Sequence, residues 1–330
     1  MLSEFDLIKQ YFQRSRPASA QTVLGIGDDC ALLAPSAGRL LAVSSDMLVE
    51  DRHFFAGADP FLLGHKSLAV NLSDLAAMGA VPLGFTLALA LPRAEPAWLD
   101  GFSRGLFALA DAHGCELVGG DTTRGPLNIC ITIFGEVWPG RTLRRDAALP
   151  GDDIWVSGTL GDARLWLAAQ TGDTALDPAL DPALDPDDLA LAAQRMHAPT
   201  PRVALGRLLA EGGLAHAALD ISDGLVGDIG HILAASRVGA LLDVDALPAG
   251  PVLARQAPEL RRRFTAAGGD DYELCFTAPA AQRDAVLAAG AASGTAVTRV
   301  GRIEAAPGLR LVDSAGAPLT MRLQGWDHFK

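Results

Sequence analysis

Apolar and polar residues follow one another along this chain in blocks that predict alternating helices and strands. Ser3–Phe12 has apolar residues on one helical face and a serine at the N-cap position, so we expect a short helix there. The other elements predicted in the first half are a strand over Arg39–Ser45, a helix over Pro60–Met78, a strand over Leu83–Leu91, a helix over Glu95–His113, a strand over Glu116–Val118 and a strand over Leu127–Val137. This alternation is typical of an α/β or α+β fold whose sites lie at strand ends.

The pattern becomes polar over Arg141–Asp152, which contains a Pro-Gly pair and is typical of a domain boundary. We therefore expect two domains, 1–150 and 151–330, and 330 residues are enough to give each its own core. The elements predicted in the second half are a strand over Asp153–Ser157, a helix ending at Gln170, a helix over Pro201–Glu211, a strand over His216–Leu219, a helix ending at Ala235, a strand over Ala240–Val244 and a strand over Tyr272–Thr277.

One segment breaks the alternation, because the four residues Ala-Leu-Asp-Pro occur three times in succession from Ala175. Proline at every fourth position cannot continue a regular helix. We expect a surface insertion or a string of turns over 175–187 and assign it no function.

Composition and charge narrow the class of partner. Apolar residues make up 49% of the chain and charged residues 20%, as in an ordinary globular protein. The formal charge of −12 argues against a broad nucleic-acid surface, which needs clustered Lys and Arg. A small anionic substrate is still compatible with this charge, because bound metal ions reverse the local sign.

The compartment is predicted from three further features. No apolar run has transmembrane length, and the first residues lack the basic region of a secretory signal. The four cysteines are widely spaced without a Cys-x-x-Cys pair, which favours free thiols over a zinc site or a disulfide framework. We expect a cytoplasmic protein with no membrane partner.

Aspartates beside glycine or hydroxyl residues recur along the whole chain. Neighbouring carboxylates repel each other unless a cation or backbone donors neutralise them. We therefore hypothesise one shared site for magnesium and phosphate, although Gly25–Cys30, Gly119–Asp121 and Ser222–Gly224 are each, taken alone, more typical of an Asx-type turn. The stretches are Gly25–Cys30, Ser44–Asp46, Asn71–Asp74, Gly119–Thr122, Asp220–Gly224 and Gly269–Asp271.

Asp74 stands out because it follows apolar positions on a predicted helix and precedes Leu-Ala-Ala. A buried carboxylate without a partner is very costly, so either a metal ion or Lys66 must neutralise it. The sequence has neither a P-loop nor the protein-kinase motif set. If this protein handles ATP, it must hold the phosphates mainly through metal ions on aspartates, a role that suits magnesium.

Six blocks that run in order over nearly the whole chain resemble the thiamine-monophosphate kinases. These kinases belong to the superfamily of aminoimidazole ribonucleotide synthetase and selenophosphate synthetase. The blocks are Gly-Ile-Gly-Asp-Asp-Cys-Ala (25–31), Ala-Val-Asn-Leu-Ser-Asp-Leu-Ala-Ala-Met-Gly-Ala (69–80), Gly-Gly-Asp-Thr-Thr-Arg-Gly-Pro-Leu (119–127), Asp-Ile-Ser-Asp-Gly-Leu (220–225), Gly-Gly-Asp-Asp-Tyr-Glu-Leu-Cys-Phe (268–276) and Gly-Trp-Asp-His-Phe (325–329).

The resemblance implies a two-domain synthetase-like fold and a homodimer. In that fold a mixed N-terminal sheet with helices pairs in the dimer, and an α/β C-terminal domain completes the nucleotide and substrate site. The implied activity is transfer of the ATP γ-phosphoryl group to thiamine monophosphate with several magnesium ions. ATP is the co-substrate and thiamine diphosphate the product.

The resemblance also implies roles for individual residues, carried over position by position. The implied magnesium ligands are Asp29, Ser44, Ser45, Asp46, Asp74, Asp121, Asp220 and Asp223. The residues implied to contact ATP are Gly120, Asp121, Arg145 and Ser222, and those implied to line the thiamine phosphate pocket are His53, Asp270 and Trp326. The residues implied in catalysis are Asp74, Asp121, Asp223 and Arg145.

Position 270 departs from the family, which usually has Gly-Gly-Glu-Asp where this chain has Gly-Gly-Asp-Asp. The shorter side chain weakens that substrate contact or adds a water. By residue type alone, His53 is as typical of a solvated loop residue as of a ligand, and Trp326 is more typical of a packing anchor than of a stacking platform. The arginines of the run Arg141–Arg145 are typical either of a solvated face or of a clamp for phosphate oxygens.

Phosphoryl transfer to a phosphate monoester needs no general base, because the attacking oxygen is already ionised near neutral pH. We therefore predict direct in-line transfer without a phosphoenzyme. Two alternatives remain open: a superfamily relative with another acceptor, and a non-catalytic magnesium-nucleotide sensor. Selenophosphate synthetase needs a reactive Cys in the first 24 residues, and the hydrogenase-maturation relative needs a C-terminal Cys. This chain has neither.

Overall fold

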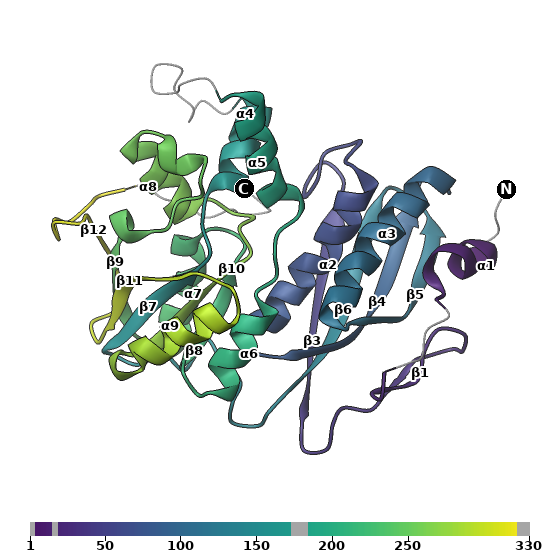
Figure 1. The fold of residues 1–330 in the computed structure, drawn as a ribbon, viewed down its shortest axis with the longest axis horizontal. Helices are drawn as coiled ribbons and strands as arrows, with labels where there is room; N and C mark the ends of the chain where they lie inside the picture. Colours follow the sequence, from purple (N-terminus) through teal and green to yellow (C-terminus); the bar gives the residue numbers. More distant parts are fainter. Residues whose placement is uncertain (1–3, 15–18, 173–183, 322–330) are drawn as a thin grey trace. The chain divides into compact units, whose positions relative to one another are not determined.

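A computed structural model describes residues 4–14, 19–172 and 184–321 of the chain. Two compact units account for them. Unit 1 is formed by the described residues of Met1–Leu75 and Ala80–Gly140, and unit 2 by those of Ala76–Gly79 and Arg141–Lys330. Each unit has its own sheet and helices, in agreement with the predicted mixture of helix and strand (Figure 1).

Unit 1 begins with two short pieces where one helix was predicted. Helix α1 (Glu4–Leu7) is followed by a π-helical turn, η1 (Ile8–Phe12), and Ser3 lies outside the described residues. Two short strands, β1 (Thr22–Leu24) and β2 (Leu32–Leu33), then form a small antiparallel sheet. The predicted glycine-aspartate turn is the connection between them.

The main sheet of unit 1 has four strands in the order β3-β6-β4-β5. Its pairings are antiparallel except for the parallel pair β4–β5, so the sheet is mixed, as predicted. The strands are β3 (Leu40–Val49), β4 (Val81–Leu91), β5 (Glu116–Arg124) and β6 (Asn128–Val137).

Two predicted strand ends are wrong in this sheet. β3 was expected to stop at Ser45, yet it continues to Val49 because its full length pairs with β6. β5 was expected to stop at Val118, yet its pairing with β4 extends it to Arg124. Asp46 and Asp121 therefore lie within strands, where rigid backbone on both sides holds them.

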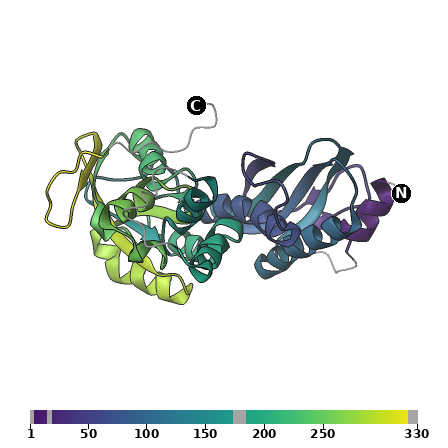
Figure 2. The ribbon, with the colours of Figure 1, turned by 90° about the horizontal axis from the view of Figure 1, so that it is seen from above.

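Helices α2 (Pro60–Ala77) and α3 (Pro96–His113) both cover the same face of this sheet (Figure 2). The side chains of Ile131, Phe85 and Leu89 fill the layer between helices and sheet, and each is at most 1% exposed. The two helices approach closely at Gly105, where an added Cβ would lie 1.8 Å from the Phe61 carbonyl oxygen. Glycine at this position is therefore a packing requirement.

Unit 2 contains a six-stranded sheet in the order β12-β9-β11-β7-β10-β8, antiparallel except for the pair β12–β9. The strands are β7 (Asp152–Ser157), β8 (Ala217–Ile221), β9 (Gly239–Asp243), β10 (Glu273–Pro279), β11 (Val297–Glu304) and β12 (Gly308–Val312). β7 and β8 are buried along their whole length, although β7 begins with two aspartates and ends with a serine, and β8 contains Asp220.

The helices of unit 2 are α4 (Asp162–Thr171), α5 (Pro186–His197), α6 (Val203–Glu211), α7 (Leu225–Ser236), α8 (Pro258–Ala267) and α9 (Arg283–Ala292). Unit 2 also contains the short 3-10 helices η2 (Val244–Ala246), η3 (Leu253–Arg255) and η4 (Ala280–Gln282). No element was predicted for α5, α8, α9, β11 or β12.

The start of α5 explains the end of the repeated segment. Residues 175–183 of the predicted insertion lie outside the described residues. The last Asp-Pro pair begins α5 rather than a turn: Asp185 is the N-cap, its carboxylate accepts the Asp188 amide at 2.8 Å, and Pro186 is the first helical residue. Both residue types are favourable at these positions.

No helix within 4–14, 19–172 and 184–321 combines the length and apolar character needed to cross a bilayer.

We predict opposite stability effects for two glycine-to-alanine substitutions in helices. Gly105→Ala must force α2 and α3 apart and should lower the free energy of unfolding by about 1–3 kcal/mol. Gly230 in α7 has no atom within 4 Å of an added Cβ, so Gly230→Ala should raise it by roughly 0.5–1 kcal/mol. Chemical denaturation followed by circular dichroism measures both. Equal effects would show that the approach of α2 to α3 is not tight.

Candidate functional site

In unit 1 a group of polar side chains connects strand β3 to helix α2. The Ser44 hydroxyl donates a hydrogen bond to the Asp74 carboxylate, and the Asp46 carboxyl hydrogen-bonds with Asp74 as well. Burial raises the pKa of Asp46 to about 7, and the neighbouring charge of Asp74 acts in the same direction. Two carboxyl groups in contact need a shared proton or a cation between them. Their oxygen atoms fit a hard divalent cation such as magnesium.

Ser45 is adjacent in sequence but belongs to the other face of the sheet. Its hydroxyl lies 3.0 Å from the Thr132 hydroxyl and donates to the Ile131 carbonyl at 3.2 Å. The alternation of side chains along a strand separates it from Ser44 and Asp46. Any ligand that Ser45 offers to the Asp46–Asp74 group is therefore its backbone carbonyl.

Asp121 lies at the opposite edge of the same sheet. The register pairs it with Ala88 of β4, while Asp46 of β3 pairs with Ile131 of β6. Three strand spacings separate β3 from β5, which is about 14 Å along the sheet. Asp46 and Asp121 of one chain therefore cannot bind the same ion.

The backbone at position 120 requires a glycine for structural reasons, independent of any ligand. Its φ is 145°, and an added Cβ would lie 1.9 Å from the Leu87 carbonyl oxygen. The glycine lets β5 approach β4 closely and leaves the exposed Asp121 beside a bare stretch of backbone. Such a stretch is open to the approach of a phosphate group.

Asp29 lies in the exposed connection between β1 and β2. The Asp28 carboxylate accepts the Asp29 amide at 2.8 Å, which is the local turn bond that the sequence allowed as an alternative. This bond occupies Asp28 and leaves the exposed Asp29 as the outward-facing carboxylate of the pair.

His53 lies in the turn after β3, and its tautomer follows from one contact. The Val49 amide donates to His53 Nδ1 at 3.0 Å. A backbone amide always donates, so Nδ1 is the acceptor and the neutral ring carries its hydrogen on Nε2. His53 can thus present an N–H group to a partner without becoming charged.

Unit 2 places the predicted residues Asp220, Ser222 and Asp223 at the end of β8 and in the turn before α7. The Asp228 carboxylate, in the first turn of α7, accepts the amides of both Ser222 and Asp223 at 3.1 Å. Burial raises the pKa of Asp228 to about 7, and the charge of Asp223 adds to this effect. Asp228 was missed from the sequence. The available signal was an acidic residue in the first helical turn after a Ser-Asp-Gly turn.

The Asp270 turn lies directly beside this segment. The Asp270 amide donates to the Ser222 carbonyl at 2.8 Å, and the Tyr272 amide donates to the Ile221 carbonyl at 2.8 Å. A residue predicted to contact substrate and one predicted to contact ATP are therefore neighbours within unit 2. Asp271, by contrast, is buried, which raises its pKa well above the usual range, and its carboxyl accepts the Gly161 amide at 2.9 Å.

Arg145 is held away from Ser222 within the same unit. The Ser236 hydroxyl, at the C-terminal end of α7, donates to the Arg145 carbonyl at 2.8 Å. The Ser222 turn precedes the N-terminal end of the same helix, whose twelve residues span about 18 Å. Within one chain, the exposed Arg145 therefore lies near the opposite end of α7 from the Ser222 turn. Trp326, the third residue predicted for the substrate pocket, lies outside the described residues.

Within the described ranges, no group of three or more His, Cys, Asp and Glu side chains is arranged to hold a metal ion. Six of the predicted magnesium ligands belong to unit 1, and Asp220 and Asp223 belong to unit 2.

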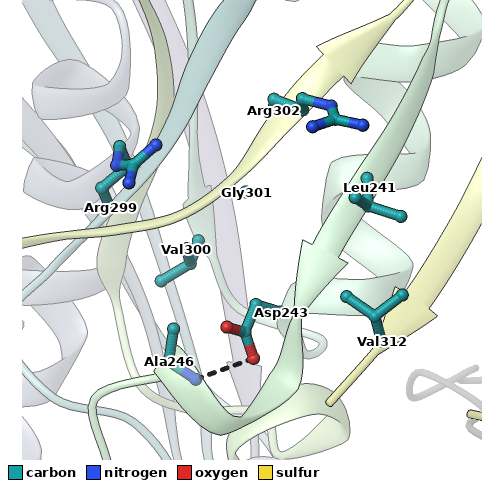
Figure 3. Close-up of a pocket in the computed structure, with 8 residues that line it drawn as sticks. All are labelled: Leu241, Asp243, Ala246, Arg299, Val300, Gly301, Arg302 and Val312. Carbon is teal, nitrogen blue, oxygen red and sulfur yellow. Dashed lines mark hydrogen bonds between the residues drawn. The ribbon is translucent and has the colours of Figure 1, made fainter. Parts of the chain in front are cut away.

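A cavity of about 170 Å³ lies at the other edge of the unit 2 sheet, among β9, β11 and β12 (Figure 3). Two of the side chains that line it are arginines. Arg299 pairs with Asp153 at 3.3 Å, and Arg302 pairs with Glu304 at 3.0 Å. None of the predicted site residues lines this cavity.

The chain matches two family models in sequence. Residues 27–137 match the N-terminal domain of AIR synthase related proteins, and residues 150–314 match the C-terminal domain. A thiamine-monophosphate kinase from Salmonella typhimurium is 44% identical over 328 residues, which cover 99% of this chain and 98% of the relative. The Escherichia coli K12 thiamine-monophosphate kinase is 45% identical with the same coverage.

Solved structures are similar as well. The crystal structure of a thiamine-monophosphate kinase from Stenotrophomonas maltophilia K279a has 48% identity and a TM-score of 0.81, covering 91% of this chain and 93% of its own. AaThiL complexed with AMPPCP and TMP has 30% identity and a TM-score of 0.75, covering 92% of each chain.

We predict that two adjacent serines contribute differently to cation binding. Magnesium chloride should raise the melting temperature of the wild-type chain by mass action. Ser44→Ala removes a hydrogen bond to a charged carboxylate and should weaken magnesium binding by about tenfold. Ser45→Ala, on the opposite face, should leave the magnesium-induced shift unchanged. Thermal unfolding over a magnesium titration measures all three, and equal losses in both variants would contradict the assignment of faces.

Proposed function

The chain belongs to the thiamine-monophosphate kinase family, and from this premise we propose that it transfers the γ-phosphoryl group of ATP to thiamine monophosphate by direct in-line transfer. Thiamine diphosphate and ADP are the products. Sequence identity of 44–45% over nearly the whole length of two thiamine-monophosphate kinases supports this reaction. A relative bound to an ATP analogue and TMP supports the two substrates.

The observation that carries the proposal on this chain is the Ser44–Asp46–Asp74 group, in which two carboxyl groups are held in contact. We assign several magnesium ions to the acidic residues. When bound, they offset the charge of the phosphate groups and stabilise the charge that develops during transfer. The ligands in this proposal are Asp29, Ser44, Ser45 through its carbonyl, Asp46, Asp74, Asp121, Asp220 and Asp223.

The remaining contacts with ATP come from groups that bind phosphate well. Gly120 leaves backbone accessible, and Arg145 offers an exposed guanidinium whose planar donors fit phosphate oxygens. The Ser222 hydroxyl belongs to a turn that Asp228 holds rigid through two amides. Rigid placement of these groups orients the phosphate groups of ATP, and orienting the substrates is the main contribution of the protein to this reaction.

Thiamine monophosphate is bound by His53, Asp270 and Trp326 in this proposal. His53 donates its Nε2–H to the phosphate, since Nδ1 is occupied by the Val49 amide. Asp270 is tied to Ser222 and brings acceptor-binding and ATP-binding residues together in unit 2. The indole face of Trp326 is attracted to the cationic ring system of thiamine by roughly 0.5–2 kcal/mol.

No protein side chain acts as a general base in this mechanism. The attacking oxygen belongs to a phosphate monoester that is ionised near neutral pH. The chain's own residues orient the two substrates and reduce their mutual repulsion. No covalent intermediate forms on the protein.

We also propose that the chain is a homodimer whose unit 1 sheets pair. α2 and α3 cover one face of this sheet, and no other described helix of unit 1 covers the opposite face (Figure 2). That open face carries Leu41, Val43 and Met47, whose exposed fractions are 48%, 57% and 53%. A row of exposed apolar side chains on an uncovered sheet face is typical of a protein interface.

A cytoplasmic location completes the proposal. All four cysteines are free thiols, and Cys115 and Cys275 are buried. Free thiols are typical of a reducing compartment.

The proposed function is tested by the release of ADP from ATP in the presence of magnesium. We expect ADP formation that depends on thiamine monophosphate and produces thiamine diphosphate. Asp74→Asn should fold but lose most of its turnover at every ATP concentration, because it disrupts the carboxyl pair. ADP release that is independent of the acceptor, or near-normal turnover in Asp74→Asn, would contradict the proposal. So would a labelled phosphoryl-protein that passes its label to thiamine monophosphate.

The homodimer is tested by one charge on the open face. Val43→Glu should convert a dimer into a monomer, because it buries a carboxylate in the interface. Leu287→Glu is the control, since Leu287 is 49% exposed on α9 of unit 2. Sedimentation velocity should show a dimer for the wild type and for Leu287→Glu. A dimer in all three proteins would place the interface elsewhere.

A further inference from the structure

The Gly268–Tyr272 turn contains two non-glycine residues whose backbone conformation is intrinsically unfavourable. Asp270 has a φ of 64° and Tyr272 a φ of 51°, although neither is glycine. A side chain makes the left-handed region unfavourable, so the surroundings must hold the turn in place. The turn carries Asp270, which the proposed function assigns to thiamine monophosphate, and the inference below rests on that assignment.

Two sets of contacts hold the turn. On one side, the amides of Asp270 and Tyr272 donate to the end of β8, at 2.8 Å each. On the other side, the Asp271 carboxyl is buried and accepts the Gly161 amide, and Arg195 Nη2 donates to the Asp271 carbonyl at 3.1 Å. Arg195 is thus a charged side chain that reaches the backbone of the turn.

Arg195 is itself fixed by a buried carboxylate. Glu273 is fully buried and accepts Arg195 Nη2 at 2.8 Å, Arg202 Nε at 2.6 Å and the Ser157 hydroxyl at 2.6 Å. The Arg195 and Arg202 side chains are only 18% and 15% exposed. A buried carboxylate that is paired in this way holds its partners firmly, because breaking a pair leaves an uncompensated charge.

The two arginines share one partner but differ in a second contact. Arg202 binds Glu273 through two nitrogens, whereas Arg195 bridges Glu273 and the Asp271 carbonyl with a single nitrogen. Arg195 comes from the last turn of α5, and Arg202 directly precedes α6. Both stabilise the buried carboxylate of Glu273, which directly follows the turn in sequence, and of the two Arg195 also donates to the backbone of the turn itself.

We propose that Arg195 is a positioning residue for thiamine monophosphate: it holds the Asp270 turn in its left-handed conformation and so orients Asp270 toward the acceptor. It touches neither substrate. Its effect passes through the Asp271 carbonyl to the neighbouring residue, and Glu273 keeps its guanidinium in place. Arg202 has no such role, although it is equally buried and shares the same carboxylate.

The matched variants Arg195→Gln and Arg202→Gln test this in the full-length protein. Both remove a donor from Glu273 and should lower the melting temperature by similar amounts. Arg195→Gln should raise the KM for thiamine monophosphate by about tenfold, the cost of roughly one hydrogen bond, with the KM for ATP unchanged. Arg202→Gln should leave both KM values unchanged. Hydrogen exchange of peptides that cover 268–272 should accelerate in Arg195→Gln alone.

Arg195→Lys is the second variant, because it keeps the charge opposite Glu273 but lacks the planar guanidinium. It should show a smaller rise in the same KM, and it carries the test if Arg195→Gln does not fold. An equal rise in KM for Arg195→Gln and Arg202→Gln would overturn the proposal. So would accelerated exchange in Arg195→Gln with an unchanged KM for thiamine monophosphate.

The wild-type assay separates the two proposals. If the wild-type chain releases ADP only with thiamine monophosphate and Arg195→Gln behaves like the wild type, the positioning role alone fails. If the wild-type chain shows no acceptor-dependent turnover, the proposed function fails, and the role of Asp270 in substrate binding fails with it.

Discussion

The structure depends on negative charge that rigid backbone holds close together. Asp46 sits within a strand that pairs along its full length, and Asp74 sits on a helix packed closely against a neighbouring helix, so neither backbone can move away from the other. At an effective dielectric of about 20, two charges at 4 Å repel by about 4 kcal/mol. A proton or a cation must relieve that repulsion. Burial and the charge of Asp74 raise the pKa of Asp46, which favours its protonated form.

In unit 2, buried carboxylates are bound by hydrogen-bond donors of the protein. Its carboxylates are matched to donors inside the unit: Asp228 to the amides of a turn, Asp271 to the Gly161 amide, and Glu273 to two arginines and a serine. These contacts shape the turns that carry Ser222, Asp223 and Asp270, although the second carboxyl oxygen of the buried Asp271 has no hydrogen-bond partner. Carboxylates repel one another in both units, as Asp223 and Asp228 do in unit 2, but in unit 2 backbone amides and arginines also bind them and so stabilise the turns.

Much of the fold could be predicted from the sequence, because the apolar pattern of long segments such as α2, α3, β4 and β6 is enough to identify each as a helix or a strand. The ends of β3 and β5 could not. Asp46 was predicted to follow a strand that ends at Ser45, and Gly119-Gly120-Asp121 resembles a turn until its pairing with β4 is known. The location of acidic residues was visible in the sequence, but their grouping was not. The contact between Glu273 and Arg195 spans 78 positions, and nothing in the pattern connects two charges so far apart. The opposite faces of Ser44 and Ser45 could have been expected from the predicted strand Arg39–Ser45, because successive side chains of a strand alternate between its faces.

The start of α5 bears on how this chain tolerates changes in length. Every copy of the Ala-Leu-Asp-Pro repeat ends in Asp-Pro, and the last copy supplies both the N-cap Asp185 and the first helical residue Pro186. If a copy is gained or lost, the copy that then stands last still places Asp-Pro before the helix. Copy-number variation in the gene can therefore alter the insertion while the helix that carries Arg195 keeps an identical beginning.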